Sequence, residues 1–312
     1  MDRNTINKIV WWIPIRSIRD KMRDKLNEKL DNKISDELKF PTITWQIDSD
    51  DEEDNKKRNI IRDILIKDNE NNLDLHNYFI ENKNLALHKP LSYFDVYEKH
   101  FSKFRGKDIT ILEIGVQNGG DLKMWEHYFS KNNAKVTIYG IDINEKSKQV
   151  ENENIKIFIG SQSDREFLRK IKAEIPKVDI LIDDGGHTME QQIVTFEEMY
   201  DHIKDDGLYW CEDTGTSYWT SFGGGYKNPS SYIEYTKNLI DYLNAYSAIK
   251  KDSLEVTDFT NKTYGIHYYE NIVVIEKKIR KIIPDDICSD AIIGVNKLWK
   301  KIPVSKTYKV KP

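Results

Sequence analysis

The sequence has little cysteine and no long apolar run, and both features narrow the class of protein. Its two cysteines, Cys211 and Cys288, cannot form the disulfide framework typical of small secreted domains, which favours a reducing cytoplasm. No apolar stretch approaches the roughly 20 residues that a membrane-spanning helix needs. The longest one near the start, residues 9–15, is too short and has no small-residue cleavage site after it. We therefore expect a cytoplasmic protein.

The sequence also has no excess of basic residues over acidic ones. Lys and Arg together number 48 against 52 Asp and Glu, which gives a formal net charge of −4. A protein that binds nucleic acid through its phosphates is usually basic, so nucleic acid is not a predicted partner. With 312 residues and no internal repeat of fixed period, the chain is long enough for one α/β domain with extensions.

The texture of the sequence divides the chain into four predicted segments. Residues 1–47 are an amphipathic, helical N-terminal arm, and residues 48–90 combine an acidic linker with a polar helical segment. Residues 91–278 alternate regularly and form the main domain, and residues 279–312 are a C-terminal tail. Within the arm, residues 8–30 place Trp and Ile beside Lys and Arg, which predicts a peripheral contact at the inner membrane face. A surface helix or a dimerisation arm is the alternative.

Apolar runs of strand length alternate with amphipathic stretches of helix length in the main domain. This alternation is typical of βαβ units and predicts a Rossmann-like, doubly wound α/β sheet that is mostly parallel. The last two apolar runs predict a C-terminal antiparallel hairpin. The predicted strands are residues 109–116, 135–142, 155–160, 178–183, 207–212, 265–269 and 272–276, and the predicted helices are residues 121–130, 164–175, 189–203 and 230–244.

The first predicted strand leads into a glycine-containing loop at the edge where open parallel sheets bind their ligands. Gly115 lets the backbone turn sharply, and Gly119 and Gly120 remove side chains where a ligand must approach closely. With Glu113 inside the strand the pattern is E-x-G-x-x-x-G, which differs from the G-x-G-x-x-G spacing of dinucleotide-binding loops. The loop therefore suits a cofactor that lacks a pyrophosphate.

The next two predicted strands end in polar side chains that suit a nucleoside. Asp142 ends the second strand, where a carboxylate can accept hydrogen bonds from both ribose hydroxyls; a helix cap is the alternative for a single Asp after a strand. Gln162 and Ser163 follow the third strand and are placed to hydrogen-bond an adenine edge. The ordered set, at strand-sized intervals, predicts a nucleoside-containing cofactor.

The fourth and fifth predicted strands end in a concentration of ionisable groups. Asp183, Asp184 and His187 follow the fourth strand, and Glu212 and Asp213 end the fifth. Carboxylates this close repel one another, and a divalent cation removes the repulsion. Ligands that are all oxygen favour Mg²⁺ or Mn²⁺ over zinc. His187 follows two glycines on a loop, and it is the candidate base for an acceptor hydroxyl.

Taken in order, these motifs resemble those of the class I S-adenosylmethionine-dependent methyltransferases. The Asp184-Gly-Gly-His187 and Glu212-Asp213 motifs are similar to those of the metal-dependent macrolide-sugar (mycinamicin-type) and rhamnosyl O-methyltransferases, and the likeness covers residues 88–278. The resemblance implies S-adenosylmethionine and Mg²⁺ (or Mn²⁺) as cofactors. It implies Asp184, Glu212 and Asp213 as metal ligands and His187 as the catalytic base. It also implies a cofactor site formed by Glu113, Gly115, Gln117, Gly119, Gly120, Asp142, Gln162, Ser163 and Asp183.

The reaction that the resemblance implies is methyl transfer to a sugar hydroxyl of a glycan, a glycolipid or a natural-product glycoside. From the same resemblance we also expect the chain to form a homo-oligomer. Residues 214–231 are rich in Gly, Ser, Thr and aromatic side chains, and we expect Tyr218, Trp219, Phe222 and Tyr226 to stack on the sugar or cover the site. A packed surface loop is the alternative for this segment. Two other functions remain open: a metal-dependent O-methyltransferase of a small phenolic or catechol compound, and a non-catalytic, cofactor-binding partner protein.

Overall fold

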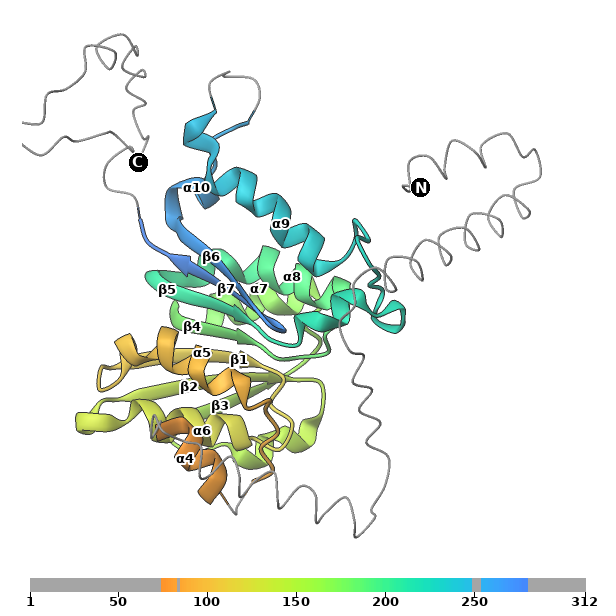
Figure 1. Cartoon of the computed structure of the whole chain (residues 1–312). Helices are drawn as coiled ribbons and strands as arrows, with labels where there is room; N and C mark the ends of the chain where they lie inside the picture. Colours follow the sequence, from red (N-terminus) through yellow and green to blue (C-terminus); the bar gives the residue numbers. More distant parts are fainter. Residues whose placement is uncertain (1–73, 83–84, 249–253, 280–312) are drawn as a thin grey trace, which may run out of the picture. The chain divides into compact units, whose positions relative to one another are not determined.

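The structure is a computed structural model that describes residues 74–82, 85–248 and 254–279 (Figure 1). The chain divides after Asp68 into two compact units, and every described residue belongs to the second unit. The predicted N-terminal arm with its membrane contact, the acidic linker, and the C-terminal tail from residue 280 onward lie outside the described residues.

A seven-stranded mixed sheet, in the order β3-β2-β1-β4-β5-β7-β6, runs through the described part of the chain. Neighbours among the first five strands pair in parallel, whereas β7 is antiparallel to both β5 and β6. This topology confirms the predicted Rossmann-like α/β sheet with a C-terminal antiparallel hairpin. The strands are β1 (Ile109–Ile114), β2 (Val136–Asp142), β3 (Ile155–Ile159), β4 (Val178–Asp183), β5 (Ile203–Cys211), β6 (Thr263–Tyr269) and β7 (Ile272–Lys277).

Helices cover both faces of the sheet (Figure 1). One apolar cluster joins α4, α5 and α6 to strand residues such as Ile180 and Trp210, and a second joins α7, α8 and α9 to Leu181 and Tyr209. Because both faces are covered, β4 is buried along its whole length, as is usual for a central parallel strand. The helices are α4 (Asp74–Glu81), α5 (Ser92–Phe101), α6 (Gly120–Phe129), α7 (Arg165–Glu174), α8 (Met189–Met199), α9 (Tyr232–Leu243) and α10 (Asp258–Lys262).

The boundary between α8 and β5 differs from the prediction. A helix was predicted to continue to residue 203 and a strand to begin at residue 207, but α8 ends at Met199 and a short 3-10 turn, Tyr200–His202, follows it. β5 then begins at Ile203 and carries the exposed Asp205 and Asp206 within it. No helix was predicted over α5, whose aromatic side chains are buried against the sheet.

Candidate active site

The carboxyl ends of β1, β4 and β5 bring the sequence motifs together at one edge of the sheet. The backbone N–H of Asp184 donates to the carbonyl of Ile114 at 2.9 Å, and the N–H of Glu212 donates to the carbonyl of Asp183 at 2.9 Å. These bonds extend the parallel ladders one step past the strand ends. They place the residues after β1, β4 and β5 side by side, as the topology of a parallel sheet requires.

The glycine loop after β1 packs directly against the backbone after β4. Gly115 has a φ of +93°, and a Cβ on it would lie 1.9 Å from the carbonyl oxygen of Asp184. Gly119 precedes α6 with a φ of +75°, and a Cβ on Gly120 would lie 2.2 Å from the carbonyl oxygen of Ala86. Glycine is required at Gly115 for two separate reasons, the backbone conformation and the contact.

Replacing Gly115 with alanine is expected to destabilise the fold by at least about 2 kcal/mol, because strain in the backbone adds to a clash with backbone atoms. Thermal or urea unfolding measures the loss. Gly223→Ala is the matched control, since Gly223 has a similar φ of +82° but a Cβ there meets nothing closer than Met189 Cγ at 3.7 Å. A G115A protein no less stable than G223A would contradict the predicted clash.

Asp142 fixes the shape of the same loop. Its Oδ2 accepts hydrogen bonds from the backbone N–H of Val116 at 2.9 Å and of Gln117 at 2.8 Å, and its Oδ1 accepts from Asn144 N–H at 2.7 Å. Gln117 itself has a left-handed backbone with a φ of +48°. In the described structure Asp142 therefore organises the loop, and its contact with ribose hydroxyls stays a prediction.

Gln162 ties the loop after β3 to the loop after β4. Its Nε2 donates to Asp183 Oδ1 at 2.9 Å and to Thr195 Oγ1 at 3.1 Å, while its Oε1 accepts from Gly186 N–H at 2.7 Å. Burial raises the pKa of Asp183 to about 6, and the bond from Gln162 opposes that rise. These contacts use the side-chain amide of Gln162 within the protein. The predicted roles of Gln162 and Asp183 at the cofactor stay predictions.

Ser163 lies in the same loop after β3. Its hydroxyl is 2.9 Å from that of Ser161, and its backbone N–H donates to Ser161 Oγ at 3.3 Å. Both contacts are local to the loop. The predicted contact of Ser163 with adenine stays a prediction.

A lysine that the sequence analysis did not identify lies among the acidic side chains. The Nζ of Lys89 is 2.5 Å from Asp184 Oδ2, 2.7 Å from Glu212 Oε2 and 2.9 Å from Asp121 Oδ2. Lys89 is only 6% exposed. Burial alone would lower its pKa, but the carboxylates, Glu212 first, raise the pKa of Lys89 well above its ordinary value. Lys89 is therefore a fixed internal cation of this site.

Glu212 is enclosed by donors from three different elements. Its carboxylate accepts hydrogen bonds from Lys89 Nζ, from the Tyr97 hydroxyl and, at 2.9 Å, from Trp210 Nε1. Burial raises the pKa of Glu212, and Lys89 opposes the rise. Glu212 Oε2 already accepts a hydrogen bond from Lys89, and the predicted role of Glu212 as a metal ligand stays a prediction.

Glu113 presents an unsatisfied carboxylate oxygen to this site. Its Oε2 accepts from Trp125 Nε1 at 2.7 Å, but its buried Oε1 has no hydrogen-bond partner among the described residues. Burial, and then the nearby Asp121, raise the pKa of Glu113 well above its ordinary value. A buried acceptor without a donor is destabilising. The position fits a cationic group, such as the ammonium of a bound amino-acid moiety.

Asp184, His187 and Asp213 converge on the solvent side of Lys89. One ligand atom from each lies within 4.8 Å of the others, and His187 Nε2 is 3.6 Å from Asp213 Oδ2 and 3.9 Å from Asp184 Oδ1. Tyr93 holds Asp213 by donating its hydroxyl to Oδ1 at 2.8 Å. The partly exposed carboxylates with an adjacent imidazole fit a hydrated divalent cation.

The imidazole of His187 is held in a state that accepts protons. Burial lowers its pKa below the ordinary value of 6.5, with Asp213 opposing the change. His187 has a left-handed backbone with a φ of +57°, which is strained for a residue with a side chain. Its Nδ1 is buried and has no hydrogen-bond partner among the described residues. Strain and an unsatisfied polar atom at one residue are typical of a functional site.

The segment after β5 carries exposed aromatic side chains beside this site. Tyr218, Trp219 and Tyr226 are exposed, whereas Phe222 packs partly against the second apolar cluster. The Thr216 hydroxyl donates to the carbonyl of His187 at 2.8 Å, which fastens this segment to the loop after β4. Exposed aromatic rings are suited to stacking on a sugar, and that role stays a prediction.

Sequence comparisons find relatives of this chain, although no family model matches it. Demethylmacrocin O-methyltransferase of Streptomyces fradiae is 33% identical over 194 residues, which are 59% of this chain and 48% of that protein. Mycinamicin VI 2''-O-methyltransferase of Micromonospora griseorubida is 32% identical over 192 residues, which are 58% of this chain and 47% of that protein. The chain thus spans about half the length of the curated relatives it matches.

A solved structure agrees with the sequence matches. The MycE methyltransferase from the mycinamycin biosynthetic pathway, in complex with Mg, SAH and mycinamycin VI, aligns with a TM-score of 0.56 at 26% identity. The alignment covers 79% of this chain and 66% of that chain. These matches confirm the resemblance that the motifs predicted, while the roles of individual residues stay predictions.

Proposed function

Because the chain is related to the macrolide-sugar and rhamnosyl O-methyltransferases and has their class I fold, we propose that it transfers a methyl group from S-adenosylmethionine to a sugar hydroxyl. The observation that carries the proposal is the convergence of Asp184, His187 and Asp213 beside the unsatisfied oxygen of Glu113. In this proposal Asp184, His187 and Asp213 face the acceptor, and Glu113 faces the cofactor.

The residues of the chain divide the work of the reaction. Glu113 and the glycine loop bind the methionine part of the donor, and the acidic surroundings favour its positive charges. His187 accepts the proton of the acceptor hydroxyl as the oxygen attacks the methyl carbon and the donor sulfur leaves with the bonding electrons. Tyr93 holds Asp213 in place beside the imidazole. Because both reactants are held in position, the reaction also gains from proximity.

A divalent metal ion belongs to this proposal. Mg²⁺ or Mn²⁺ held by Asp184 and Asp213, with Glu212 as the further predicted ligand, would lower the pKa of the acceptor hydroxyl. Lys89 already supplies one positive charge to Asp184 and Glu212. The crowding of carboxylates is therefore partly neutralised within the protein, and it does not by itself demand a dication. Lys89 occupies Oδ2 of Asp184 and Tyr93 occupies Oδ1 of Asp213, so the oxygens proposed to bind the ion are Asp184 Oδ1 and Asp213 Oδ2.

The acceptor is proposed as a sugar on a natural product, the class named for the relatives. Mycinamicin VI and L-olivosyl-oleandolide appear in the names of two of them. A glycolipid or polysaccharide precursor at the inner membrane face would depend on residues 8–30, which lie outside the described residues. Within the described part of the chain, no helix has the length and apolarity to cross a membrane. Homo-oligomerisation is proposed on the family resemblance alone.

Removing divalent ions is expected to lower the rate of methyl transfer by at least about 100-fold, because Lewis-acid activation contributes several kcal/mol to the transition state. Purified chain is incubated with S-adenosylmethionine and glycoside acceptors, with EDTA and then with excess MgCl₂ or MnCl₂, and the methylated product is quantified. Full activity in EDTA would exclude the metal mechanism while leaving the fold assignment intact.

The same assay separates the other two functions. Methylation of catechols but not of glycosides would favour the phenolic O-methyltransferase. Calorimetric binding of S-adenosylmethionine with no turnover of any acceptor would favour a non-catalytic partner protein. Product formation from a glycoside excludes the non-catalytic alternative.

A further inference from the structure

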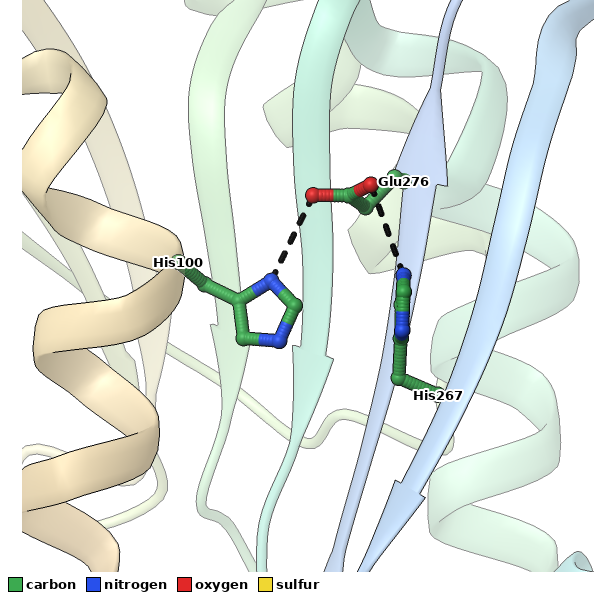
Figure 2. Close-up of side chains that lie close together, drawn as sticks. All are labelled: His100, His267 and Glu276. Carbon is green, nitrogen blue, oxygen red and sulfur yellow. Dashed lines mark hydrogen bonds and ion pairs between the residues drawn. The ribbon is translucent and has the colours of Figure 1, made fainter.

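Three side chains of the kind that bind transition metals meet between α5 and the β6–β7 hairpin (Figure 2). Glu276 on β7 lies between the imidazoles of His100, from α5, and His267, from β6 (Figure 2). His100 Nδ1 is 3.3 Å from Glu276 Oε1, and His267 Nε2 is 3.4 Å from Glu276 Oε2. One ligand atom from each of the three residues lies within 4.8 Å of the others.

This cluster is separate from the candidate active site. Glu276 pairs with Leu208 in β5, four positions before Glu212, which is roughly 13 Å along the strand. On α5, His100 follows Tyr93 by seven positions, or about 10 Å along the helix axis. An ion bound by His100 and Glu276 would therefore not be the ion proposed beside Asp213.

The spacing of the ligand atoms fits a metal better than it fits hydrogen bonds. Charge-assisted hydrogen bonds of this type close to about 2.7–2.9 Å, and both contacts here are longer. A tetrahedral zinc ion with bonds of about 2.0–2.1 Å holds its ligand atoms roughly 3.3 Å apart. In addition, the buried Nε2 of His267 has no hydrogen-bond partner among the described residues, although Glu276 lies beside it.

The surroundings of His100 orient it as a ligand. Its Nε2 is 2.9 Å from the Tyr269 hydroxyl, which can donate or accept a hydrogen bond. In the tautomer with its proton on Nε2, His100 donates to Tyr269 and presents a bare Nδ1 to Glu276. Two groups with lone pairs would then face each other, an arrangement that a cation between them stabilises. Metal-binding histidines typically have such a partner on their second nitrogen.

The carboxylate of Glu276 is partly exposed and therefore accessible to an ion. His100 is 4% exposed and Glu276 17%, but His267 is 35% exposed, so solvent reaches the cluster from the side of His267. Lys103 lies 3.5 Å from Glu276 Oε1 and competes with an ion, but weakly, because its side chain is 45% exposed.

We propose that His100, His267 and Glu276 bind a zinc-class transition-metal ion that cross-links α5 to the β6–β7 hairpin. Two imidazoles and a carboxylate prefer Zn²⁺, Ni²⁺ or Cu²⁺ over Mg²⁺, and a water molecule completes a tetrahedron. The ion would hold α5 against the sheet. Tyr93 and Tyr97, which contact Asp213 and Glu212, project from that helix.

The test measures zinc binding by the full, tag-free chain in excess MgCl₂. Titration calorimetry with ZnCl₂ gives the affinity, and thermal unfolding with and without ZnCl₂ gives the stabilisation. Wild type and His187→Gln are both expected to bind zinc and to gain thermal stability, since His187 belongs to the other site. Glu276→Gln and His267→Gln are expected to weaken zinc binding at least about tenfold. Lys103→Gln, an exposed change that leaves the fold intact, is expected to tighten binding by removing the competing ammonium.

Two results would overturn the proposal. One is zinc affinity in folded E276Q and H267Q equal to that of wild type, with no effect of K103Q. The other is loss of zinc binding in H187Q alone, which would assign the bound zinc to the site at the ends of β4 and β5. None of these outcomes depends on methyl transfer, so the metal site and the proposed function fail or succeed separately.

Discussion

Replacing His187 with glutamine is expected to lower kcat for methyl transfer by roughly 10²–10⁴, the usual contribution of a general base. Glutamine keeps a similar volume and a polar end, but it cannot take the hydroxyl proton. The structure places Nε2 of His187 3.6 Å from Asp213 Oδ2 and 3.9 Å from Asp184 Oδ1. Initial rates with both substrates saturating measure the effect.

The pH profile gives the H187Q comparison a second readout. Because burial lowers the pKa of His187 below 6.5, the imidazole is neutral at pH 7 and becomes protonated only in more acidic solution. Wild-type activity should therefore fall on the acid side below pH 6.5, and the residual activity of H187Q should lack that fall. His127→Gln, in an exposed part of α6, is the control and should keep the wild-type rate. An H187Q rate within a few-fold of wild type would show that a group other than His187 takes the proton of the substrate hydroxyl.

Replacing Lys89 with methionine is expected to lower the free energy of unfolding by about 3–5 kcal/mol, the cost of breaking a buried ion pair. Methionine approximates the length of the side chain but removes the ammonium that contacts Asp121, Asp184 and Glu212. The carboxylates that remain are buried or half-buried and close to Glu113, so they repel one another without compensation. Urea unfolding at pH 7 measures the change.

Magnesium should restore part of the stability that K89M loses. A divalent cation supplies the charge that lysine no longer provides, so MgCl₂ is expected to stabilise K89M more than wild type. Lys277→Met is the matched control: Lys277 is also buried, but it donates to the carbonyls of Tyr200 and Ile203 rather than to carboxylates. An equal response of K89M and K277M to magnesium would show that Lys89 does not balance the acidic site.

The parts of the site at strand ends could be predicted because a local pattern positions them. Asp142 closes an apolar run, Asp184 follows one and Glu113 lies near the end of one, and a parallel sheet brings such ends to a single edge. The predicted boundary was least accurate at the start of β5, because the exposed Asp205 and Asp206 interrupt the apolar pattern of that strand.

Lys89, Tyr93 and Tyr97 could not be found in this way. They lie before the first strand, and Lys89 contacts Glu212 across 123 positions of sequence. No local spacing signals such a contact. The buried residues of α5, such as Tyr93, Tyr97 and Phe101, do recur at helical spacing, so the sequence pattern could have indicated the helix but not the distant partners of its side chains. The sequence analysis therefore overestimated the repulsion among the carboxylates, because Lys89, which is distant in sequence, neutralises part of their charge.

The hydroxyl of Thr216 connects the segment proposed to contact the acceptor with the residue proposed to accept its proton. It donates to the carbonyl of His187, so the aromatic segment that follows β5 is fastened to the backbone of the residue that we propose as the base. Redesign of Trp219 or Tyr218 to admit a bulkier acceptor would then displace the imidazole as well. Broader acceptor range in this chain should come with slower turnover, even for compounds that bind tightly.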